Sequence, residues 1–345
     1  MKGIKLQDVA QRAGVSASTV TRVVRGSGYV SPETRERVEA AIRELGYIAP
    51  QRADTSFVKP YVIIISPSGD SGNLLFQKIQ EKLCLALQAQ GWLVLPYFIH
   101  RESPSEMVRA IDRMRGPGLM GVVFNCIDNQ LDLLSMRRYL VSLPTCIVMV
   151  ERSPDIYGLN KVMLNAREMV FIAIRHLAHL GHRHIAYFAV DDDREVERSR
   201  KEGFLFGINA MNIAEESHLM PIDDYLCRDG YRGMERYLKT YGLPTAVIAN
   251  DTVMVGVSNY LYRMGCRVPQ DISLMGMDDT NACYATPRLT SIAYPLEEMI
   301  QNIMRILQEY QAGRTLPQNV LLSTTLVDRG TCAAPRRATP GEDDI

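Results

Sequence analysis

Hydroxyl and guanidinium groups are concentrated near the start of the chain, in the stretch SASTVTRVVR from Ser16 to Arg25. Hydroxyls and the N–H groups of a helix N-terminus bind phosphate oxygens, and an arginine can donate two hydrogen bonds to O6 and N7 of guanine. This stretch therefore suits contact with nucleic acid. The residues that we assign to such contact are Ser16, Ala17, Ser18, Thr19, Thr21, Arg22, Arg25 and Tyr29.

Polar side chains also follow several short apolar runs in the remainder of the chain. Asn125 follows GVVF, Asn250 and Asp251 follow TAVIA, and Asp278 and Asp279 follow SLMGM. In open α/β sheets, ligands bind at the carboxyl ends of strands. Asp and Asn also cap helices, and for Asp251 and Asp279 capping and ligand contact remain equal alternatives. After the first apolar run comes SPSGDSGN, in which the ligand candidates are Ser68, Asp70 and Asn73.

Three short helices must position the first group. Apolar residues from Leu6 to Ala13 have helical spacing, and Gly14 ends this helix because glycine turns the chain without Cβ strain. Ser16 is a suitable N-cap for a second helix, whose predicted inner residues are Val20, Val23 and Val24. Ser31 can cap a third helix, whose predicted buried residues are Val38, Ala41, Ile42 and Leu45. This arrangement predicts a helix-turn-helix domain over residues 1–47.

The second group requires a larger α/β core. Short apolar runs alternate with segments of helical period, which indicates βαβ units and parallel sheets. The predicted strands are YVIII, WLVLPYF, GVVF, CIVMV, HIAYFAV, TAVIA, DISLMGM and VLLSTTLV. Their number favours two lobes with a cleft between them. After a linker at 48–60, we expect a core over 61–330, with lobe 1 at 61–160 and 291–318 and lobe 2 at 161–290 and 319–330.

Composition limits the class of protein. Of the 345 residues, 46% are hydrophobic and 23% charged, which is typical of a globular protein. Residues 1–59 carry ten Lys/Arg and six Asp/Glu, whereas the rest carries 29 and 33, so the basic excess lies where contact with a polyanion is predicted. The start MKGIKLQDVA has no apolar signal segment, no run could span a bilayer, and the seven cysteines form no CxxC pair. We therefore expect a cytoplasmic protein without a membrane partner.

The run LQDVAQRAGVSASTVTRVV and its continuation VSPETRERVEAAIRELGYIAP resemble the head of the LacI/GalR family of bacterial transcription regulators. The resemblance extends through RHLAHLGHRHIAYFAV, RKEGF, TAVIANDTVMVGV and RVPQDISLMGMDDT to PRLTSI. It implies a periplasmic-binding-protein-like core that binds a small metabolite, and a homodimer that binds a palindromic operator in double-stranded DNA.

The resemblance also implies residue roles. Arg200, Asn250 and Asp278 match effector-binding positions of the family, and Tyr225 matches an aromatic residue that stacks on the ligand, although ordinary packing is an equal alternative for it. The family follows its head with a hinge helix that wedges a leucine into the minor groove. Here the candidate hinge residues are Ala53, which matches, Ser56, which stands at the wedge position, and Phe57, which could replace the wedge after a shift in register.

Three other motifs resemble cofactor or metal sites, but their context argues against those roles. GPGLMG precedes a strand rather than following one, the histidines of HLGHRH are separated by a helix end, and DDDR is typical of a solvated loop. We therefore assign no cofactor, no metal and no catalytic residue. The last residues, 331–345, lack apolar periodicity and are expected to be disordered. We predict that the protein is a transcriptional regulator, and specifically a repressor, that is controlled by a sugar or sugar derivative. The alternatives are a solute receptor without operator function and, third, an enzyme.

Overall fold

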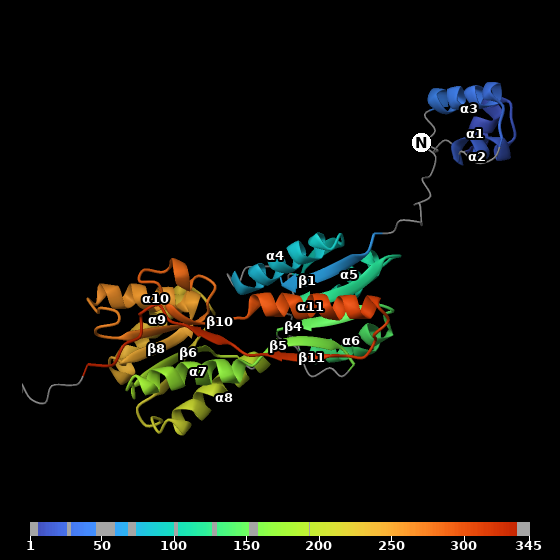
Figure 1. The fold of residues 1–345 in the computed structure, drawn as a ribbon. Coiled ribbons are helices and arrows are strands. Elements are labelled where there is room, and N and C mark those ends of the chain that lie inside the picture. The colour runs from blue at the N-terminus through green and yellow to red at the C-terminus, as the bar shows by residue number, and fades with distance from the viewer. Residues whose placement is uncertain are drawn as a thin grey trace, which may run out of the picture. The chain divides into compact units, whose positions relative to one another are not determined.

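The computed structural model describes residues 6–25, 29–45, 59–67, 74–99, 103–125, 130–151, 158–192 and 194–336. Contacts between Cα atoms divide the chain into two units, Met1–Val58 and Lys59–Ile345. The described residues of the first unit form three helices, and those of the second form two six-stranded sheets with the helices that cover them (Figure 1). Within the described residues, no helix has the length and apolar character needed to cross a membrane.

The N-terminal unit consists of α1 (Leu6–Ala13), α2 (Ala17–Arg25) and α3 (Pro32–Leu45). Gly14 has a φ of +65°, so the chain turns sharply between α1 and α2. Ser16 caps α2 as predicted, because its Oγ accepts a hydrogen bond from the Thr19 N–H at 3.2 Å. The buried residues of the unit are Val9, Ala10, Ala13, Val20, Val23, Val38 and Ala41.

Two details complete the packing of this unit. The Arg37 guanidinium of α3 donates a hydrogen bond of 2.6 Å to the Ala13 carbonyl at the end of α1, so one orphan carbonyl of that helix is satisfied. The prediction that Val24 is buried is wrong: its side chain is exposed. Each helical residue is rotated about 100° from the one before it, and the step beyond Val23 carries Val24 off the buried stripe.

Lobe 1 is built on a parallel sheet of strand order β11-β5-β4-β3-β1-β2. Its strands are β1 (Tyr61–Pro67), β2 (Leu93–Ile99), β3 (Leu119–Asn125), β4 (Cys146–Val150), β5 (Asn160–Leu164) and β11 (Asn319–Leu322). Its helices are α4 (Leu74–Ala89), α5 (Pro104–Met114), α6 (Gln130–Ser142) and α11 (Leu296–Gln311).

Both faces of this sheet are covered, which explains why its strands are continuously apolar. Along β1, Val62 and Ile64 point to the face covered by α4 and α11, whereas Ile63 and Ile65 point to the face covered by α5 and α6. Figure 1 shows α4 and α11 side by side on the first face.

Lobe 2 has a second sheet, of strand order β12-β10-β9-β8-β6-β7, in which only β10 and β12 pair antiparallel. Its strands are β6 (Ile185–Val190), β7 (His218–Ile222), β8 (Ala246–Asn250), β9 (Ser273–Asp278), β10 (Thr290–Ala293) and β12 (Thr325–Val327). Helices α7 (Ala166–His179) and α8 (Glu195–Ala210) cover one face, and α9 (Cys227–Tyr241) and α10 (Asp251–Arg263) cover the other; a short 3-10 turn, η2 (Ala282–Tyr284), follows β9.

Three strands correct the predicted lobe boundaries. β5 and β11 belong to the sheet of lobe 1, although 161–164 and 319–322 were assigned to lobe 2. β10 belongs to lobe 2, although 291–293 was assigned to lobe 1. The predicted single strand VLLSTTLV is two strands, β11 and β12, which lie in different sheets. An apolar run indicates that a strand is buried, but the sheet to which the strand belongs depends on the neighbouring strand with which it forms hydrogen bonds.

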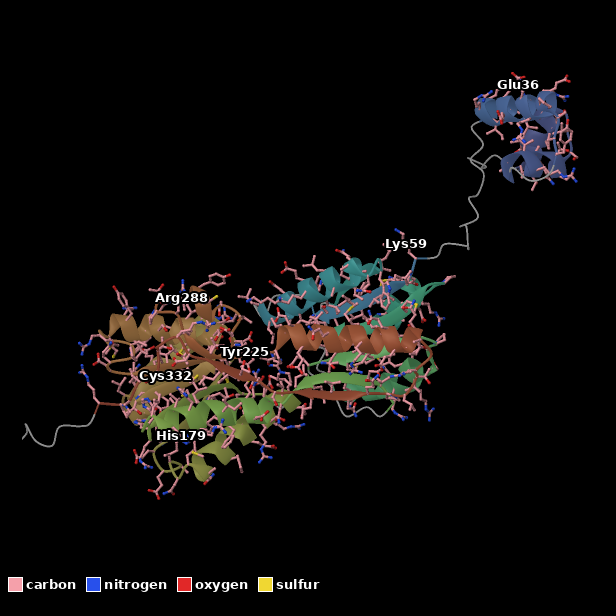
Figure 2. The ribbon with its side chains drawn as sticks, viewed as in Figure 1. Glu36, Lys59, His179, Tyr225, Arg288 and Cys332 are labelled. Atoms are coloured by element: carbon pink, nitrogen blue, oxygen red, sulfur yellow. The ribbon has the colours of Figure 1, made fainter. Side chains whose placement is uncertain are left out.

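The end of the chain also corrects a prediction. Residues 331–336 were expected to be disordered, but Thr331 is 1% exposed and its hydroxyl donates to the Leu274 carbonyl at 2.7 Å and accepts from the Thr290 N–H at 2.8 Å. Ala333 bonds to Ser273, and Cys332 lies within lobe 2 (Figure 2). Polar residues without apolar period can still be held by hydrogen bonds to a sheet. Residues 337–345 lie outside the described part.

Candidate functional site

The outer face of α2 presents most of the residues predicted to contact nucleic acid. Ser16, Ala17, Ser18 and Arg22 are exposed, and Thr19 and Thr21 are half-buried. The hydroxyls bond only to near neighbours along the helix: Ser16 to Ser18 and Thr19, and Thr21 to the Ala17 carbonyl. Local bonds of this kind exchange readily for bonds to a ligand, so the face is available for contact.

Some residues of this prediction lie elsewhere. Tyr29 is 88% exposed in the segment between α2 and α3. Arg25 ends α2, but its side chain is outside the described part, as are the hinge candidates Ala53, Ser56 and Phe57.

A second candidate site lies in lobe 2, where the carboxyl ends of its strands face lobe 1. Arg200 of α8 is 4% exposed and lies at its centre. Its Nη1 donates to the Tyr225 hydroxyl at 2.7 Å, and its Nη2 donates to the Tyr294 hydroxyl at 3.0 Å and lies 3.5 Å from Oδ1 of Asp278. Figure 2 labels Tyr225 beside the boundary between the lobes.

Close helix packing sets the position of Arg200. A Cβ atom on Gly203 would lie 2.3 Å from the Arg167 carbonyl oxygen of α7, so only glycine lets α8 approach α7 this closely. Arg200 is one turn before Gly203 on the same helix and is carried inward with it.

The sheet register brings Asn250 and Asp278 to Arg200. Asn250 ends β8 and pairs with Met277, so it lies beside Asp278 at the end of β9 and donates a hydrogen bond to its Oδ2. The Asn250 Oδ1 also accepts from the Thr252 N–H at 2.9 Å and caps α10. Asp278 has a φ of +91°, a conformation that L residues rarely adopt and that is concentrated at functional sites. The four predicted residues Arg200, Tyr225, Asn250 and Asp278 therefore form one cluster.

Two members of this cluster were missed by the sequence prediction. Glu197 is 0% exposed, its Oε2 accepts a 2.5 Å hydrogen bond from the Tyr225 hydroxyl, and its Oε1 lies 3.7 Å from Nη1 of Arg200. The signal was present, since Glu197 and Arg200 are three residues apart on a helix and so share a face. Tyr294 had no such signal, because it reaches the site by following Ala293, which pairs with Asp278 in the sheet.

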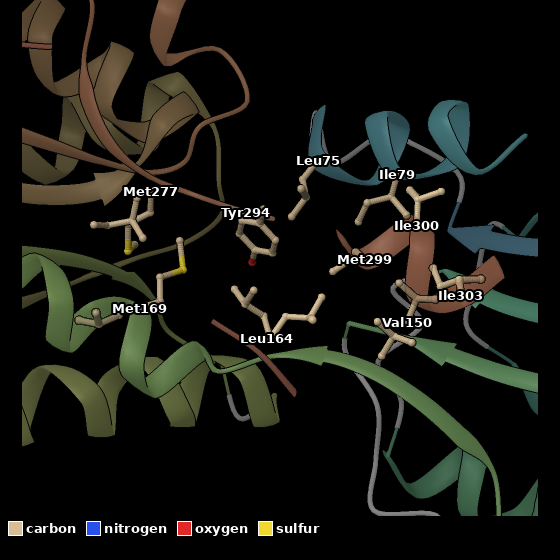
Figure 3. Close-up of a cluster of buried hydrophobic side chains, with 14 of the residues drawn as sticks. Leu75, Ile79, Val150, Leu164, Met169, Met277, Tyr294, Met299, Ile300 and Ile303 are labelled. Carbon is tan, nitrogen blue, oxygen red and sulfur yellow. The ribbon is translucent and has the colours of Figure 1, made fainter. Parts of the chain in front are cut away.

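Tyr294 also connects this cluster to lobe 1. Its hydroxyl donates to Oε2 of Glu151, which directly follows β4, at 3.5 Å. Lys78 of α4 donates a second interlobe hydrogen bond, to the Thr280 carbonyl. Figure 3 shows the Tyr294 ring between Met277 and Met169 of lobe 2 and a group of lobe 1 residues that comprises Leu75, Leu164 and Met299. The polar cluster is thus bordered by apolar side chains.

Of the effector-binding candidates in lobe 1, only Asn125 lies in the described part of the chain. Asn125 ends β3 and is 0% exposed; its Nδ2 donates to the Ser66 hydroxyl at 3.2 Å and to the Phe76 carbonyl at 3.1 Å. It therefore ties the ends of β1 and α4 together. Ser68, Asp70 and Asn73 lie outside the described part.

Asp251 and Asp279, for which capping and ligand contact were equal alternatives, both have partners within lobe 2. Asp251 is 0% exposed and accepts hydrogen bonds from the Thr280 N–H at 2.8 Å and the Ser291 hydroxyl at 2.9 Å, so it holds the segment after β9. Asp279 forms an ion pair of 2.7 Å with Arg329. Neither carboxylate contacts Arg200 in the described bonds.

Side chains of the motifs HLGHRH and DDDR, which we did not assign to metal binding, bond to other residues of the protein. His179 bonds to the Arg175 carbonyl, His182 to the Ala333 carbonyl and His184 to the Tyr237 hydroxyl. Asp192 of DDDR pairs with Arg194 at 2.5 Å. Among the described residues, no group of three or more His, Cys, Asp or Glu side chains is placed to hold a metal ion.

Protonation in the cluster follows from burial and charge. Burial lowers the pKa of Arg200, but the neighbouring tyrosines and carboxylates outweigh it and hold that pKa well above its ordinary value. Burial raises the pKa of Tyr225 well above its ordinary value; Arg200 opposes this shift and Glu197 adds to it. The guanidinium therefore stays charged and the Tyr225 hydroxyl stays a donor. Such a cluster can bind and orient polar groups of a small molecule.

Two family models match the chain. Residues 5–50 match the model of bacterial regulatory proteins of the lacI family, and residues 174–332 match that of a periplasmic binding protein-like domain. The first match contains all of α1, α2 and α3, and the second contains Arg200, Tyr225, Asn250 and Asp278.

Similar proteins match along nearly the whole chain. The lactose operon repressor of Escherichia coli (strain K12) is 28% identical over 98% of this chain and 93% of its own length. The HTH-type transcriptional repressor PurR of Erwinia tasmaniensis is 29% identical over 95% of this chain and 96% of its own. Among solved structures, the lac repressor dimer bound to operator and the anti-inducer ONPF has a TM-score of 0.71 at 26% identity, and the transcriptional regulator CelR–cellobiose complex has 0.66 at 26%. The match to the lac repressor dimer covers 96% of this chain and 100% of that chain, and the match to the CelR complex covers 95% of this chain and 99% of that chain.

Proposed function

We propose that this chain, which matches the model of bacterial regulatory proteins of the lacI family over residues 5–50 and resembles transcriptional repressors along nearly its whole length, is a DNA-binding transcriptional repressor of that family. A small molecule bound between the lobes of its core controls its affinity for DNA. The repressor acts in the cytoplasm, where bacterial DNA lies, and it has no part in catalysis.

The observation that carries this proposal is the exposed face of α2. A helix whose outward residues are Ser16, Ala17 and Ser18 has short side chains, so its backbone can lie deep in a major groove. Arg22 then reaches a base edge or a phosphate, and the helix N-terminus with Thr19 and Thr21 binds backbone phosphates. The turn at Gly14 and the cap at Ser16 fix where α2 begins after α1, as a helix-turn-helix requires.

The effector belongs at the cluster around Arg200. Its hydrogen-bonding groups converge at the carboxyl ends of β8 and β9, where ligands of parallel sheets bind. A sugar or sugar derivative, which combines several hydroxyls with an apolar ring face, matches the polar cluster and its apolar border of Met169, Met277 and Leu164. Cellobiose in the CelR complex supports this chemistry.

Control of DNA affinity requires that the effector distinguish two arrangements of the lobes. The contacts of Tyr294 with Glu151 and of Lys78 with Thr280 join the lobes next to the effector cluster. An effector that engages Arg200 competes for or reinforces these contacts. Because the DNA-binding unit precedes lobe 1, a change in lobe arrangement alters how two heads of a dimer meet the operator.

A homodimer is part of the proposal, because one head reads one half-site and two-fold proteins match palindromic sites. A surface for it is present in lobe 1. β2 is an edge of the described sheet, and its Leu93, Leu95 and Phe98, with Leu85 of the adjoining α4, are exposed. Apolar residues gathered in this way on an edge strand are typical of an interface.

The test is selection of binding sites for the full-length protein from random duplex DNA at a fixed salt concentration. We expect a palindrome with two half-sites, and we expect Arg22→Ala to lose the enrichment. Arg43→Ala, which removes an exposed arginine from α3, is the matched control. Enrichment of no sequence by the wild type, with or without sugars added, would overturn the repressor proposal and favour a solute receptor.

A further inference from the structure

The Arg200 guanidinium is already occupied on both of its terminal nitrogens. Nη1 bonds to Tyr225 and lies 3.7 Å from Glu197, and Nη2 bonds to Tyr294 and lies 3.5 Å from Asp278. Both carboxylates are buried, at 0% and 3% exposure. One positive charge is therefore enclosed by two negative ones at short range, where the low dielectric of a buried site makes the interaction strong.

Glu197, like Tyr294, is a member of this cluster to which the sequence prediction assigns no role. Its Oε2 accepts a hydrogen bond of 2.5 Å from the Tyr225 hydroxyl, so one of its two oxygens already has a donor. Its other oxygen, Oε1, is buried and accepts no hydrogen bond from any described residue. A buried acceptor without a donor is unfavourable, and a ligand that supplies the donor removes that cost.

Two further cations near Arg200 are also paired with carboxylates. Arg194 lies 2.5 Å from Asp192, and Lys201 lies 3.4 Å from Asp191. A phosphate or carboxylate that approaches α8 thus meets an acidic partner beside each of these three cations.

We propose that Glu197 determines the charge class of the effector. It pairs with Arg200 and so excludes phosphorylated and carboxylated molecules, while its Oε1, which accepts no hydrogen bond from a described residue, accepts one from a hydroxyl of an uncharged effector. This inference rests on the proposed function, because it concerns the same effector site. It adds that the sugar is neutral and is selected by a carboxylate rather than by the arginine alone.

The experiment uses Glu197→Gln in the full-length protein, with inorganic phosphate as the probe. Glutamine keeps the size of the side chain and an oxygen for the Tyr225 hydroxyl but removes the charge. Binding is measured by calorimetric titration and by the shift in Tm, with chloride at equal ionic strength as the reference. Glu202→Gln, an exposed change on the same helix, is the matched control.

We expect Glu197→Gln to bind phosphate about tenfold more tightly than the wild type, a difference equivalent to about 1.4 kcal/mol. The double variant Glu197→Gln/Arg200→Gln should lose the gain, because the anion then has no guanidinium. Equal phosphate binding by wild type and Glu197→Gln, or a gain that survives in the double variant, would overturn the inference. If Glu197→Gln does not fold, Glu197→Ala carries the same expectations.

Binding of the selected DNA is measured for the same variants, which separates this inference from the proposed function. Wild type and the control variant Glu202→Gln should both bind the selected DNA, because Glu202 is an exposed residue of α8 and lies outside α2. Failure of the wild type to select any DNA overturns the repressor proposal and leaves the phosphate comparison intact. Normal DNA binding with no phosphate gain overturns only the role of Glu197.

Discussion

The hydroxyl of Tyr294, directly after β10 in lobe 2, lies 3.5 Å from Oε2 of Glu151, directly after β4 in lobe 1. The same hydroxyl accepts a hydrogen bond of 3.0 Å from Arg200. One oxygen atom thus connects the proposed effector cluster with the opposite lobe. A ligand that moves Arg200 therefore changes an interlobe contact without any longer chain of residues.

Tyr294→Phe removes this oxygen and keeps the ring in the apolar border of the site. The buried donor on Arg200 then loses an acceptor, and we expect the free energy of unfolding to fall by about 1–3 kcal/mol. Urea denaturation monitored by circular dichroism gives the value. Tyr284→Phe removes the hydroxyl of a tyrosine that is 83% exposed and should change the stability by less than about 0.5 kcal/mol. Equal stabilities for the two variants would show that the Tyr294 hydroxyl does not stabilise the contact between the lobes.

Arg22→Ala tests how α2 contacts DNA. If Arg22 reads a base, binding to the selected site should weaken by about 1–3 kcal/mol and discrimination at one base pair should relax. If it contacts a phosphate, binding should weaken for every sequence and the salt slope should fall by about one. Fluorescence anisotropy over a range of salt concentrations distinguishes the two results. Unchanged affinity on all sequences would remove Arg22 from the interface.

Asp251 predicts a dependence of stability on pH. Burial, and next the charge of Asp278, raise its pKa from the ordinary 3.8 to about 7, although hydrogen bonds from Ser291, Thr280 and Asn281 oppose the shift. The folded state therefore binds this proton more tightly than the unfolded state. Its contribution is fully present below about pH 4 and is lost as the pH rises through about 7.

The measurement compares the wild type with Asp251→Asn, which cannot titrate. Between about pH 5 and pH 8, the unfolding free energy of the wild type should fall relative to the variant by about 1–3 kcal/mol. Glu202→Gln, at an exposed position, should follow the wild type across this range. Parallel curves for wild type and Asp251→Asn would contradict the raised pKa.

The packed end of the chain gives a further prediction. Thr331 and Ala333 bond to Leu274, Thr290 and Ser273, and His182 bonds to the Ala333 carbonyl. A chain that ends at residue 330 loses these bonds, and we expect it to be less stable than a chain that ends at residue 336 by about 2–4 kcal/mol. Equal urea midpoints for the two chains would contradict a structural role for this segment.

Local sequence was sufficient to predict the N-terminal unit. The spacing of Val9, Ala10 and Ala13, the turn at Gly14 and the cap at Ser16 all act within one or two helical turns, and each appears as predicted. The one error, Val24, lies at the margin of the buried stripe, where a single 100° step separates a buried side chain from an exposed one.

In the core, the apolar runs alone predict which segments are buried strands, and polar residues follow those runs in the chain. This pattern identified Asn250 and Asp278, and the motifs of the family identified Arg200 and Tyr225. These are properties of adjacent residues, which the order of the chain fixes directly.

Hydrogen bonding between strands that are distant in the chain sets which strands share a sheet, and therefore which side chains meet. Tyr294 reaches Arg200 because β10 pairs with β9, and Glu151 reaches Tyr294 because the lobes face each other. The i, i+3 spacing of Glu197 and Arg200 places both on one helix face, but that face is buried because Gly203 lets α8 pack closely on α7. Strand pairing and burial depend on residues distant in sequence, so local spacing alone does not predict them.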